Sequence, residues 1–441
     1  MIRKYRYKIK GLIKRWCKFG FFYENISGEK LKKVKYRDLY LCKFGMSQYE
    51  YNKLTEQIFE KNIDRLKTYN KIKVSFLLFD ASLWCGDLLY NLFANDERFD
   101  VNVLLFKRKD QENENQNKNF SAGLKGLQDR GIDVTPVLDG QDENIEVADI
   151  LFYLTPYDGT LSPKFQFKNL SLDKMICYIH YGFAVGYSTL VLPIRYLVWK
   201  EFVLDKTYKK ILDELFDRDT SFSIYTGCPK NDYLYENKKE KSSTGEDVKT
   251  IIWAPHWSID DGVLYATFRD NYKFFLEYAK KNKKIKWIVK PHPNLFFSAV
   301  TSGVFERDSD FRQYLDEWDA LPNADVVVGG NYQDCFCESD AMILDSASFI
   351  MEYQYVDKPM LFLRRDTQEF NALTASVIKA SYSVAGDDLQ SIETFINDVV
   401  INGDDYKKKE REEIFHSKLD YYNDNGMLAS NYIYEYINKA F

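Results

Sequence analysis

The fold class is decided by the stretch Lys73-Val-Ser-Phe-Leu-Leu-Phe79, which is followed by a helical pattern over 85–95 and then by Val101-Asn-Val-Leu-Leu-Phe106. Short apolar runs of this kind are typical of strands that are buried on both faces of a parallel sheet. A helix between two such strands supplies the crossover connection that parallel pairing needs. The stretch therefore predicts a βαβ opening and an α/β fold.

The same alternation continues along the chain and then begins a second time. Further strands are predicted over 132–137, 150–153 and 175–179, and a second series opens with Ile251-Ile-Trp-Ala254. The second series continues with a helix over 266–281 and with strands over 287–290, 324–328, 341–344 and 360–363. The chain is thus predicted to hold two doubly wound, Rossmann-like domains.

The predicted boundaries follow from these two series. They are 1–70 for a basic, helical membrane-association region, 71–225 for the first Rossmann-like domain, 226–407 for the second, and 408–441 for C-terminal helices that pack back onto the first domain.

Composition limits the class of protein. The chain has 441 residues, of which 45% are hydrophobic and 16% aromatic, and this excludes a disordered chain because it offers ample apolar surface to bury. No apolar stretch of about 20 residues is free of charge, so a membrane-spanning helix is not expected. The longest apolar stretch, 183–204, is interrupted by Arg195 and Lys200, and it is interpreted as a buried helix or as a wall of an acceptor site.

Charge is distributed unevenly. Residues 1–43 contain 14 Lys and Arg against three acidic residues, which leaves the remainder of the chain strongly acidic. An acidic body is a poor binder of nucleic acid, because binding requires basic surface that displaces counterions from phosphates. Residues 2–19 form a basic amphipathic helical pattern that suits an anionic membrane surface, although a helix docked on its own domain would show the same pattern. We expect a peripheral protein on the cytoplasmic face of the membrane.

The seven cysteines are odd in number and scattered, so a disulfide framework is not expected and a reducing compartment is favoured. Cys335 and Cys337 are spaced too closely for a usual zinc pair, and no second Cys or His pair lies near them. They are interpreted as packed thiols.

Three of the four histidines lie at the ends of predicted strands: His180, His256 and His292. Ligands of doubly wound sheets bind outside the carboxyl ends of the strands, so these side chains are placed where a site is expected. A single histidine at a strand end is more often a capped or core residue. Three in equivalent positions favour a functional site.

Other polar residues at strand ends are candidates for phosphate binding. The segment Leu344-Asp-Ser-Ala-Ser348 predicts a helix that starts near Ser346 to Ser348, whose free backbone N–H groups would bind phosphate. Asp345, Ser346 and Ser348 would also cap such a helix without any ligand. Further candidates are Lys290, Arg364 and Arg365 as cations for a diphosphate, and Lys230 and Asp232 in the turn Gly227-Cys-Pro-Lys-Asn-Asp232. Each of these cations could equally be a surface charge.

These motifs together resemble the CDP-glycerol glycerophosphotransferase family of GT-B fold, which includes teichoic-acid polymerases and primases. The resemblance spans roughly residues 73–370 and rests on five segments in the family's order: His180-Tyr-Gly182, Gly227-Cys-Pro-Lys-Asn-Asp232, Ala254-Pro-His-Trp257, Lys290-Pro-His-Pro293 and Leu344-Asp-Ser-Ala-Ser348. The segment from His180 departs most from the family pattern, since it lacks the Thr and Lys that follow the family's His-Gly.

The resemblance implies two lobes that face a cleft, an acceptor domain first and a donor-nucleotide domain second. It implies transfer of glycerol phosphate from CDP-glycerol, or a related polyol phosphate from CDP-ribitol, to a lipid-linked glycan, with release of CMP. It makes His180 the general base and places His292 and Lys290 on the diphosphate. Ser346 and Ser348 would hold phosphate oxygens, and Asp345 would orient the turn or take a donor hydroxyl. Asp232 would be a further catalytic residue, and His256 would be a wall of the cleft, an acceptor contact or a structural residue. No metal or other cofactor is expected.

Two alternatives remain open at this level. A GT-B glycosyltransferase that uses a CMP- or UDP-sugar would share the two lobes and the phosphate-binding helix. A catalytically silent scaffold of the same fold would need no histidines at its strand ends, and the presence of three argues against it.

Overall fold

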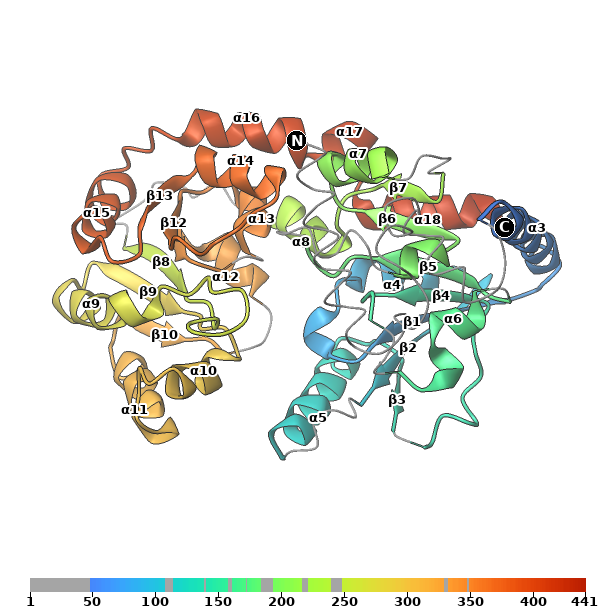
Figure 1. Cartoon of the computed structure of the whole chain (residues 1–441), viewed down its shortest axis with the longest axis horizontal. Coiled ribbons are helices and arrows are strands. Elements are labelled where there is room, and N and C mark those ends of the chain that lie inside the picture. The colour runs from blue at the N-terminus through green and yellow to red at the C-terminus, as the bar shows by residue number, and fades with distance from the viewer. Residues whose placement is uncertain are drawn as a thin grey trace, which may run out of the picture. The chain divides into compact units, whose positions relative to one another are not determined.

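The computed structural model describes residues 48–107, 114–138, 140–157, 161–171, 173–183, 193–215, 221–238, 248–328, 332–346 and 349–441. These residues fall into two compact units (Figure 1). The first unit holds the described residues up to Gly182, those from 193 to Lys230, and Tyr421–Phe441. The second holds Phe183 and the described residues from Asn231 to Asp420.

A seven-stranded sheet forms the centre of the first unit in the described part of the chain. Its strands are β1 (Ile72–Leu78), β2 (Phe99–Phe106), β3 (Val134–Val137), β4 (Ile150–Tyr153), β5 (Met175–Ile179), β6 (Lys200–Val203) and β7 (Ser223–Tyr225). They lie in the order β3-β2-β1-β4-β5-β6-β7, and each neighbouring pair is parallel. The order reverses between β1 and β4, which defines the switch point of this sheet.

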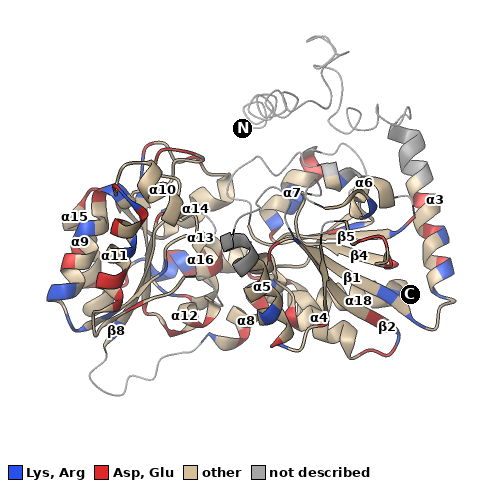
Figure 2. Cartoon of the chain, turned by 90° about the horizontal axis from the view of Figure 1, so that it is seen from below, with Lys and Arg blue, Asp and Glu red and all other residues tan. Residues whose placement is uncertain are grey.

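Helical segments connect most of these strands. The connecting helices are α4 (Asp87–Ala94), α5 (Glu114–Gln128), α6 (Phe167–Leu170) and α7 (Lys206–Leu215), with short 3-10 turns η3 (Ala81–Leu83), η4 (Pro163–Phe165) and η6 (Pro193–Tyr196). The helix α3 (Gln48–Leu66) precedes β1. Basic and acidic residues are interspersed along α3 (Figure 2). The core of the unit is aromatic: Phe76 of β1 stacks on Phe152 of β4 at 4.8 Å between ring centroids, and Phe93 of α4 lies 5.8 Å from Phe152.

The end of the chain completes the first unit through α17 (Tyr421–Asn425) and α18 (Ala429–Ala440). Ile433 and Ile437 of α18 are fully buried in the core of that unit. Tyr434 packs edge-on against Phe93 at 5.4 Å, and its hydroxyl donates to Asp96 at 2.6 Å. The last helix is therefore held by both apolar and polar contacts.

A six-stranded sheet forms the centre of the second unit. Its strands are β8 (Lys249–Ala254), β9 (Ile285–Val289), β10 (Ala324–Val326), β11 (Ala341–Leu344), β12 (Met360–Arg364) and β13 (Tyr382–Ala385). Among the described residues they pair in parallel in the order β10-β9-β8-β11-β12-β13. The switch point of this sheet lies between β8 and β11.

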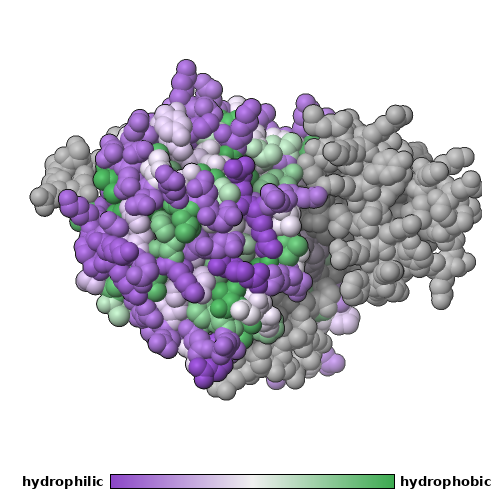
Figure 3. All heavy atoms as spheres, turned by 60° about the vertical axis from the view of Figure 1, so that its left-hand side comes forward, coloured by the Kyte–Doolittle hydropathy of each residue, from purple (hydrophilic) through white to green (hydrophobic). Residues whose placement is uncertain are grey.

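The helices of the second unit surround this sheet. They are α8 (Pro229–Asn237), whose first two residues belong to the first unit, and α9 (Phe268–Lys281), α10 (Leu295–Thr301), α11 (Asp308–Asp319), α12 (Gln333–Glu338), α13 (Phe349–Glu352), η7 (Tyr353–Val356), α14 (Ala372–Ala380), α15 (Leu389–Thr394), the π-helical η8 (Phe395–Ile401) and α16 (Lys408–Lys418). Three tryptophans pack together in the core, with Trp253 lying 5.8 Å from Trp318 and Trp287 lying 6.0 Å from it. The visible surface on this side is mostly hydrophilic, with small scattered apolar areas (Figure 3).

The predicted α/β class with two doubly wound units is confirmed. One local prediction was wrong: residues 183–204 were interpreted as a buried helix or a wall, whereas 200–203 form strand β6 between β5 and β7. Lys200 is the first residue of the strand, and the carboxylate of Glu201 accepts a hydrogen bond from the buried Arg195. The two charged residues are therefore compatible with a strand at this position.

The observed division also differs from the predicted boundaries. It falls at Lys230 instead of 225, and α16 stays with the second unit while only α17 and α18 join the first. The ring of Phe415 on α16 meets Tyr355 of η7 at 5.2 Å, which accounts for the position of that helix.

No helix in the described part of the chain is long and apolar enough to cross a bilayer. The predicted basic helix over 2–19 lies outside the described residues and stays a prediction. The five cysteines that are described are free thiols: Cys85, Cys177, Cys228, Cys335 and Cys337.

The tightest turn of the first unit gives a stability prediction. Gly227 has a φ of +88°, and a Cβ added there would lie 2.1 Å from Cγ of Tyr421. Gly131 has a φ of +77° with no heavy atom within 4 Å of such a Cβ. We expect Gly131→Ala to cost about 1–2 kcal/mol of unfolding free energy from the left-handed backbone alone. Gly227→Ala should cost about 1–3 kcal/mol more because it also overpacks α17.

Urea unfolding of both variants measures this difference. Equal losses in the two variants would contradict the steric contribution of Tyr421.

Candidate active site

The carboxyl ends of the strands in the second unit carry most of the predicted site residues. His256 lies two residues after β8, Lys290 directly follows β9, and Asp345 directly follows β11. Because β8 lies between β9 and β11 in a parallel sheet, these three strand ends share one edge. The switch point at which ligands of such sheets bind lies between β8 and β11, so the cluster occupies the expected position.

Asp345 holds the two sides of this switch point together. Its Oδ1 accepts the backbone N–H of His256 at 2.6 Å, and its Oδ2 accepts the backbone N–H and the hydroxyl of Thr267 at 2.5 and 2.8 Å. The carboxyl group is buried, and burial raises its pKa to about 6 in spite of these hydrogen bonds. The bonds join the end of β11 to the end of β8 and to the start of α9. Two roles were predicted for Asp345, orienting the turn or binding a donor hydroxyl, and both stay predictions.

His256 and His292 are oriented by the same local device. Nδ1 of His256 accepts the backbone N–H of Ser258 at 3.2 Å, and Nδ1 of His292 accepts the backbone N–H of Asn294 at 3.1 Å. An imidazole whose Nδ1 accepts a hydrogen bond carries its proton on Nε2 when it is neutral. The ring centroids are 5.4 Å apart. The two rings therefore offer neighbouring Nε2–H donors.

Both imidazoles are neutral at physiological pH. Burial lowers the pKa of His256 to about 3, with a smaller effect from His292. Burial likewise lowers the pKa of His292 to about 4, helped by the positive charge of Lys290. The pair can donate hydrogen bonds to an anion without carrying charge, while Lys290 supplies the charge.

Lys290 is buried, and its ammonium lies 5.8 Å from the centroid of the Tyr332 ring. The hydroxyl of Tyr332 donates to the carboxylate of Glu352, which is buried on α13. An ammonium over an aromatic face is attracted by the ring quadrupole, so Tyr332 helps to keep this cation at the strand end.

A helix follows β11, as predicted. Residues 349–352 form the single turn α13, which continues as η7 and ends at Asp357 with a left-handed φ of 50°. Binding of phosphate at this helix stays a prediction. Ser346 is buried beside Asp345, and Ser348 lies outside the described residues.

The two arginines after β12 behave differently. The side chain of Arg364 is exposed at the end of the strand. Arg365 instead donates to the backbone carbonyls of Ile259 and Ala266 and so braces the loop after β8. Arg364 remains available as a cation, whereas Arg365 is used within the unit.

Lys230 and Asp232 lie in the first turn of α8. Asp232 is buried and Lys230 is partly buried. Their predicted contacts with the donor stay predictions.

His180 occupies the equivalent strand-end position in the first unit, directly after β5. It is buried, and its Nε2 lies 2.7 Å from Oε1 of Glu201 on β6. Nε of Arg195 donates to both oxygens of the same carboxylate, at 2.9 and 3.1 Å. Arg195 also donates to the hydroxyl of Tyr208, whose ring meets His180 edge-on at 5.2 Å.

Opposing effects act on the charges of this network. Burial raises the pKa of Glu201, but Arg195 and His180 outweigh burial and hold the pKa below its ordinary value. Burial lowers the pKa of His180, and the carboxylate of Glu201 opposes that shift. The carboxylate therefore stays ionised beside a neutral imidazole. His180 is the one histidine of the three strand-end histidines that is paired with an acid in the described structure.

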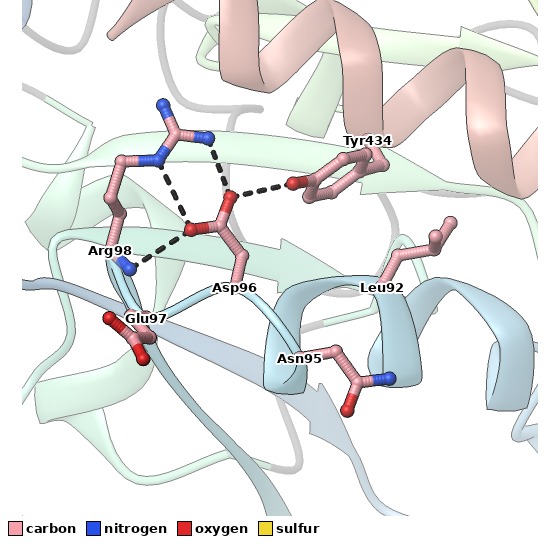
Figure 4. A pocket seen from close by; sticks show the side chains of 6 residues that line it. All are labelled: Leu92, Asn95, Asp96, Glu97, Arg98 and Tyr434. Carbon is pink, nitrogen blue, oxygen red and sulfur yellow. Dashed lines mark hydrogen bonds and ion pairs between the residues drawn. The ribbon is translucent and has the colours of Figure 1, made fainter.

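Two surface features are not candidates for this chemistry. A hollow of about 560 Å³ at the start of β2 is lined by Leu92, Asn95, Asp96, Glu97, Arg98 and Tyr434 (Figure 4). Arg98 is paired with Asp96 at 2.5 Å, so its charge is already compensated. The fourth histidine, His416, is exposed and bonded to Asp420 at 2.7 Å. Within the described ranges, no group of three or more His, Cys, Asp or Glu side chains is arranged to hold a metal ion.

Sequence reasoning missed Glu201, Arg195, Thr267 and Tyr332. The signal for Glu201 was present, because an acidic residue inside the apolar run Trp199-Lys-Glu-Phe-Val203 needs a buried partner if the run is a strand. The partnership of Thr267 with Asp345 crosses 78 residues and leaves no local pattern.

Comparison with known proteins supplies a family for the second half of the chain. A family model described as CDP-glycerol:poly(glycerophosphate) glycerophosphotransferase matches residues 199–439. No curated protein sequence matches the chain.

Solved structures of low sequence identity share its fold. The chain is similar to MnaA of S. aureus with UDP, with a TM-score of 0.54 and 13% identity over 83% of this chain and 97% of that one. It is also similar to UDP-GlcNAc 2-epimerase of Neisseria meningitidis bound to UDP-GlcNAc, with a TM-score of 0.51 and 14% identity over 84% and 100%. The wall teichoic acid polymerase TagF, as a histidine variant with CDPG, has a TM-score of 0.50 and 12% identity over 90% and 98%. The predicted GT-B class is confirmed at this level.

The junction at Asp345 predicts a graded loss of stability. Asp345→Ala leaves two buried backbone N–H groups without an acceptor and should cost at least about 2 kcal/mol. Asp345→Asn keeps one acceptor oxygen and should lose less. Because burial raises the pKa to about 6, the native state holds this proton more tightly than the unfolded chain. The contribution of Asp345 to stability therefore decreases as pH rises from about 4 to about 6, and this slope should be absent from both variants.

Urea unfolding across pH 4–7 measures both effects, and the exposed Asp325→Asn is the control, expected to change stability by less than about 1 kcal/mol. If Asp345→Ala has the same free energy of unfolding as the wild type, the three hydrogen bonds do not hold the junction.

Proposed function

The chain belongs to the CDP-glycerol:poly(glycerophosphate) glycerophosphotransferase family, and from this membership we propose that it moves glycerol phosphate from CDP-glycerol to a hydroxyl of a lipid-linked cell-surface glycan and releases CMP. The enzyme is a transferase. The product would be a teichoic-acid-like or capsular polymer.

The observation that carries the donor half of this proposal is the cluster at the switch point of the second unit. His256 and His292 offer neutral N–H donors, and Lys290 adds a buried positive charge beside them. A diphosphate that links two organic groups carries a fixed negative charge and exposes several acceptor oxygens, so it matches this combination of donors. The matched family segment, 199–439, contains the whole cluster.

The acceptor half of the proposal rests on His180. The acceptor oxygen would form a bond to the β-phosphorus of CDP-glycerol, and its proton would pass to His180. The bond between that phosphorus and the bridging oxygen would break, and CMP would leave with the electron pair. Lys290 and the two Nε2–H donors would stabilise the charge that develops on the diphosphate, as electrostatic stabilisation and positioning supply most of the catalysis in phosphoryl transfer.

We further propose that the protein works at the cytoplasmic membrane surface. The basic amphipathic pattern over 2–19 suits anionic lipid, and a lipid-linked acceptor would be presented there.

Release of CMP tests the reaction. The purified full chain is incubated with CDP-glycerol, CDP-ribitol, CMP-sugars or UDP-sugars, with a membrane extract as the source of acceptor. We expect acceptor-dependent release of CMP from a CDP-polyol. Turnover with a nucleotide sugar alone would overturn the phosphotransferase proposal and leave the fold unaffected.

Loss of the base should affect the chemical step. We expect His180→Ala to lower kcat by about 10²- to 10⁴-fold, the usual contribution of general base catalysis. CDP-glycerol binding should be retained, because the donor cluster belongs to the other unit. Steady-state kinetics and calorimetry measure the two effects.

The control for this variant is His416→Ala, since His416 is exposed and lies on α16. Full activity of His180→Ala would rule out its role as the base.

Neutral donors predict how binding depends on pH. Because the pKa values of His256 and His292 are lowered to about 3 and about 4, both rings stay neutral between pH 6 and pH 8. The Kd for CDP-glycerol should therefore be nearly constant over this range. His292→Ala should weaken binding by about 10- to 100-fold, since a hydrogen bond to a charged group contributes about 1.5–3 kcal/mol. His292→Gln keeps an N–H donor and should lose less.

Isothermal titration at three pH values provides the test. An affinity that rises steeply towards pH 6 would show that the diphosphate binds imidazolium.

A further inference from the structure

We propose that Glu201 is a positioning residue that fixes the tautomer of His180, so that Nδ1 is the nitrogen that accepts the acceptor hydroxyl's proton. This inference rests on the proposed function for the identity of the reaction. The geometry that carries it belongs to the first unit alone.

First, the carboxylate of Glu201 determines which nitrogen of His180 carries the proton. An ionised carboxylate only accepts hydrogen bonds. With Oε1 of Glu201 lying 2.7 Å from Nε2 of His180, that nitrogen must carry the proton of the neutral ring. Nδ1 then holds the lone pair. Among the described residues, Nδ1 has no hydrogen-bond partner, so the basic nitrogen is not already occupied by one of them.

The second step is the reason why Glu201 stays ionised in a fully buried position. Arg195 is also fully buried and donates to both carboxylate oxygens from its Nε. Tyr208 on α7 accepts from the same guanidinium, and the ring of Tyr178 on β5 lies tilted against His180 at 4.4 Å between ring centroids. Among the residues that the structure describes, the groups that face His180 are therefore one carboxylate, one guanidinium and two phenols. Arg195 compensates Glu201, and the phenols shape the ring's position.

The third step contrasts this site with the second unit. In His256 and His292 a backbone N–H binds Nδ1, and the ring presents Nε2–H. In His180 a carboxylate binds Nε2, and the ring presents Nδ1. The first arrangement produces hydrogen-bond donors and the second produces a proton acceptor. A carboxylate behind an imidazole also stabilises the imidazolium that forms once the proton has moved.

Glu201→Leu is the informative variant, because it removes the acceptor that fixes the ring. Oε1 of Glu201 contacts both Nε2 of His180 and Nε of Arg195, so the carboxamide oxygen of Glu201→Gln can accept both hydrogen bonds and keep the native tautomer. Glu201→Gln therefore removes the charge and retains the acceptor. In Glu201→Leu no acceptor holds the proton on Nε2, so the neutral ring can carry it on Nδ1. Glu201→Asp remains an acceptor-only group and should keep the native tautomer.

Nitrogen-15 NMR of histidine-labelled full-length protein measures the tautomer directly and requires no turnover. Only four histidines are present, and single His→Gln variants assign their signals. In the wild type we expect a protonated Nε2 and an unprotonated Nδ1 for His180 at neutral pH. A protonated Nδ1 in the wild type would overturn the inference, whether or not the protein transfers glycerol phosphate.

Kinetics of the variants supply the second readout. We expect Glu201→Leu to lose the fixed tautomer, to lower kcat by about 10²- to 10⁴-fold and to leave CDP-glycerol binding unchanged. Removal of the negative charge should also move the acidic limb of the pH–rate profile of the residual activity to lower pH, since Glu201 opposes the lowering of the pKa of His180 by burial. Glu201→Asp should recover part of the activity.

Glu146→Leu is the matched control, because this carboxylate is exposed and paired with Lys73. Native-like activity of a folded Glu201→Leu, or a loss of activity without a change of tautomer, would contradict the positioning role. If Glu201→Leu fails to fold, the wild-type NMR measurement decides the question alone. A correct tautomer with no CMP release from any CDP-polyol would separate a failure of the proposed function from a failure of this inference.

Discussion

The organisation of the second unit depends on one buried carboxylate. Asp345 lies where the strand order reverses, and it accepts hydrogen bonds from the end of β8 and from the start of α9. Burial of the carboxyl group is unfavourable, as its raised pKa shows, so the hydrogen bonds must compensate. In return the loop that carries His256 is held at a defined distance from the loop that carries His292, which packs back onto the carbonyl of Pro255.

Histidine chemistry differs between the two units because the ring nitrogens meet different partners. In the second unit, backbone amides bind Nδ1, and burial without an acidic partner keeps both rings neutral. In the first unit, Glu201 binds Nε2 and is itself compensated by Arg195. The same side chain is thus prepared as a hydrogen-bond donor in one place and as a proton acceptor in the other. A transfer reaction between a hydroxyl and a diphosphate requires both functions.

Much of the fold could be predicted from local patterns, since buried parallel strands are short apolar runs that are visible in the sequence. The strands β4, β5 and β11 were predicted with their observed bounds, and β1 and β8 differ by two residues or fewer at each end. Strand β6 was missed because Lys200 and Glu201 interrupt the apolar run, and the compensation of Glu201 by Arg195 is visible only after folding.

The sequence by itself determined the fold class, the two units and the positions of His180, His256 and His292 at the ends of strands, because hydrophobic periodicity and strand ends are local properties of the chain. Only the tertiary structure decided the protonation and orientation of those histidines. The N–H groups on Nδ1 of His256 and His292 are only two residues away, but the burial that keeps these rings neutral comes from the fold. Glu201, which binds the ring of His180, is 21 residues distant, and Asp345, which binds the backbone of His256, is 89 residues distant. Hydrogen bonds across such separations depend on which strands become neighbours in a sheet, and no local pattern encodes that order.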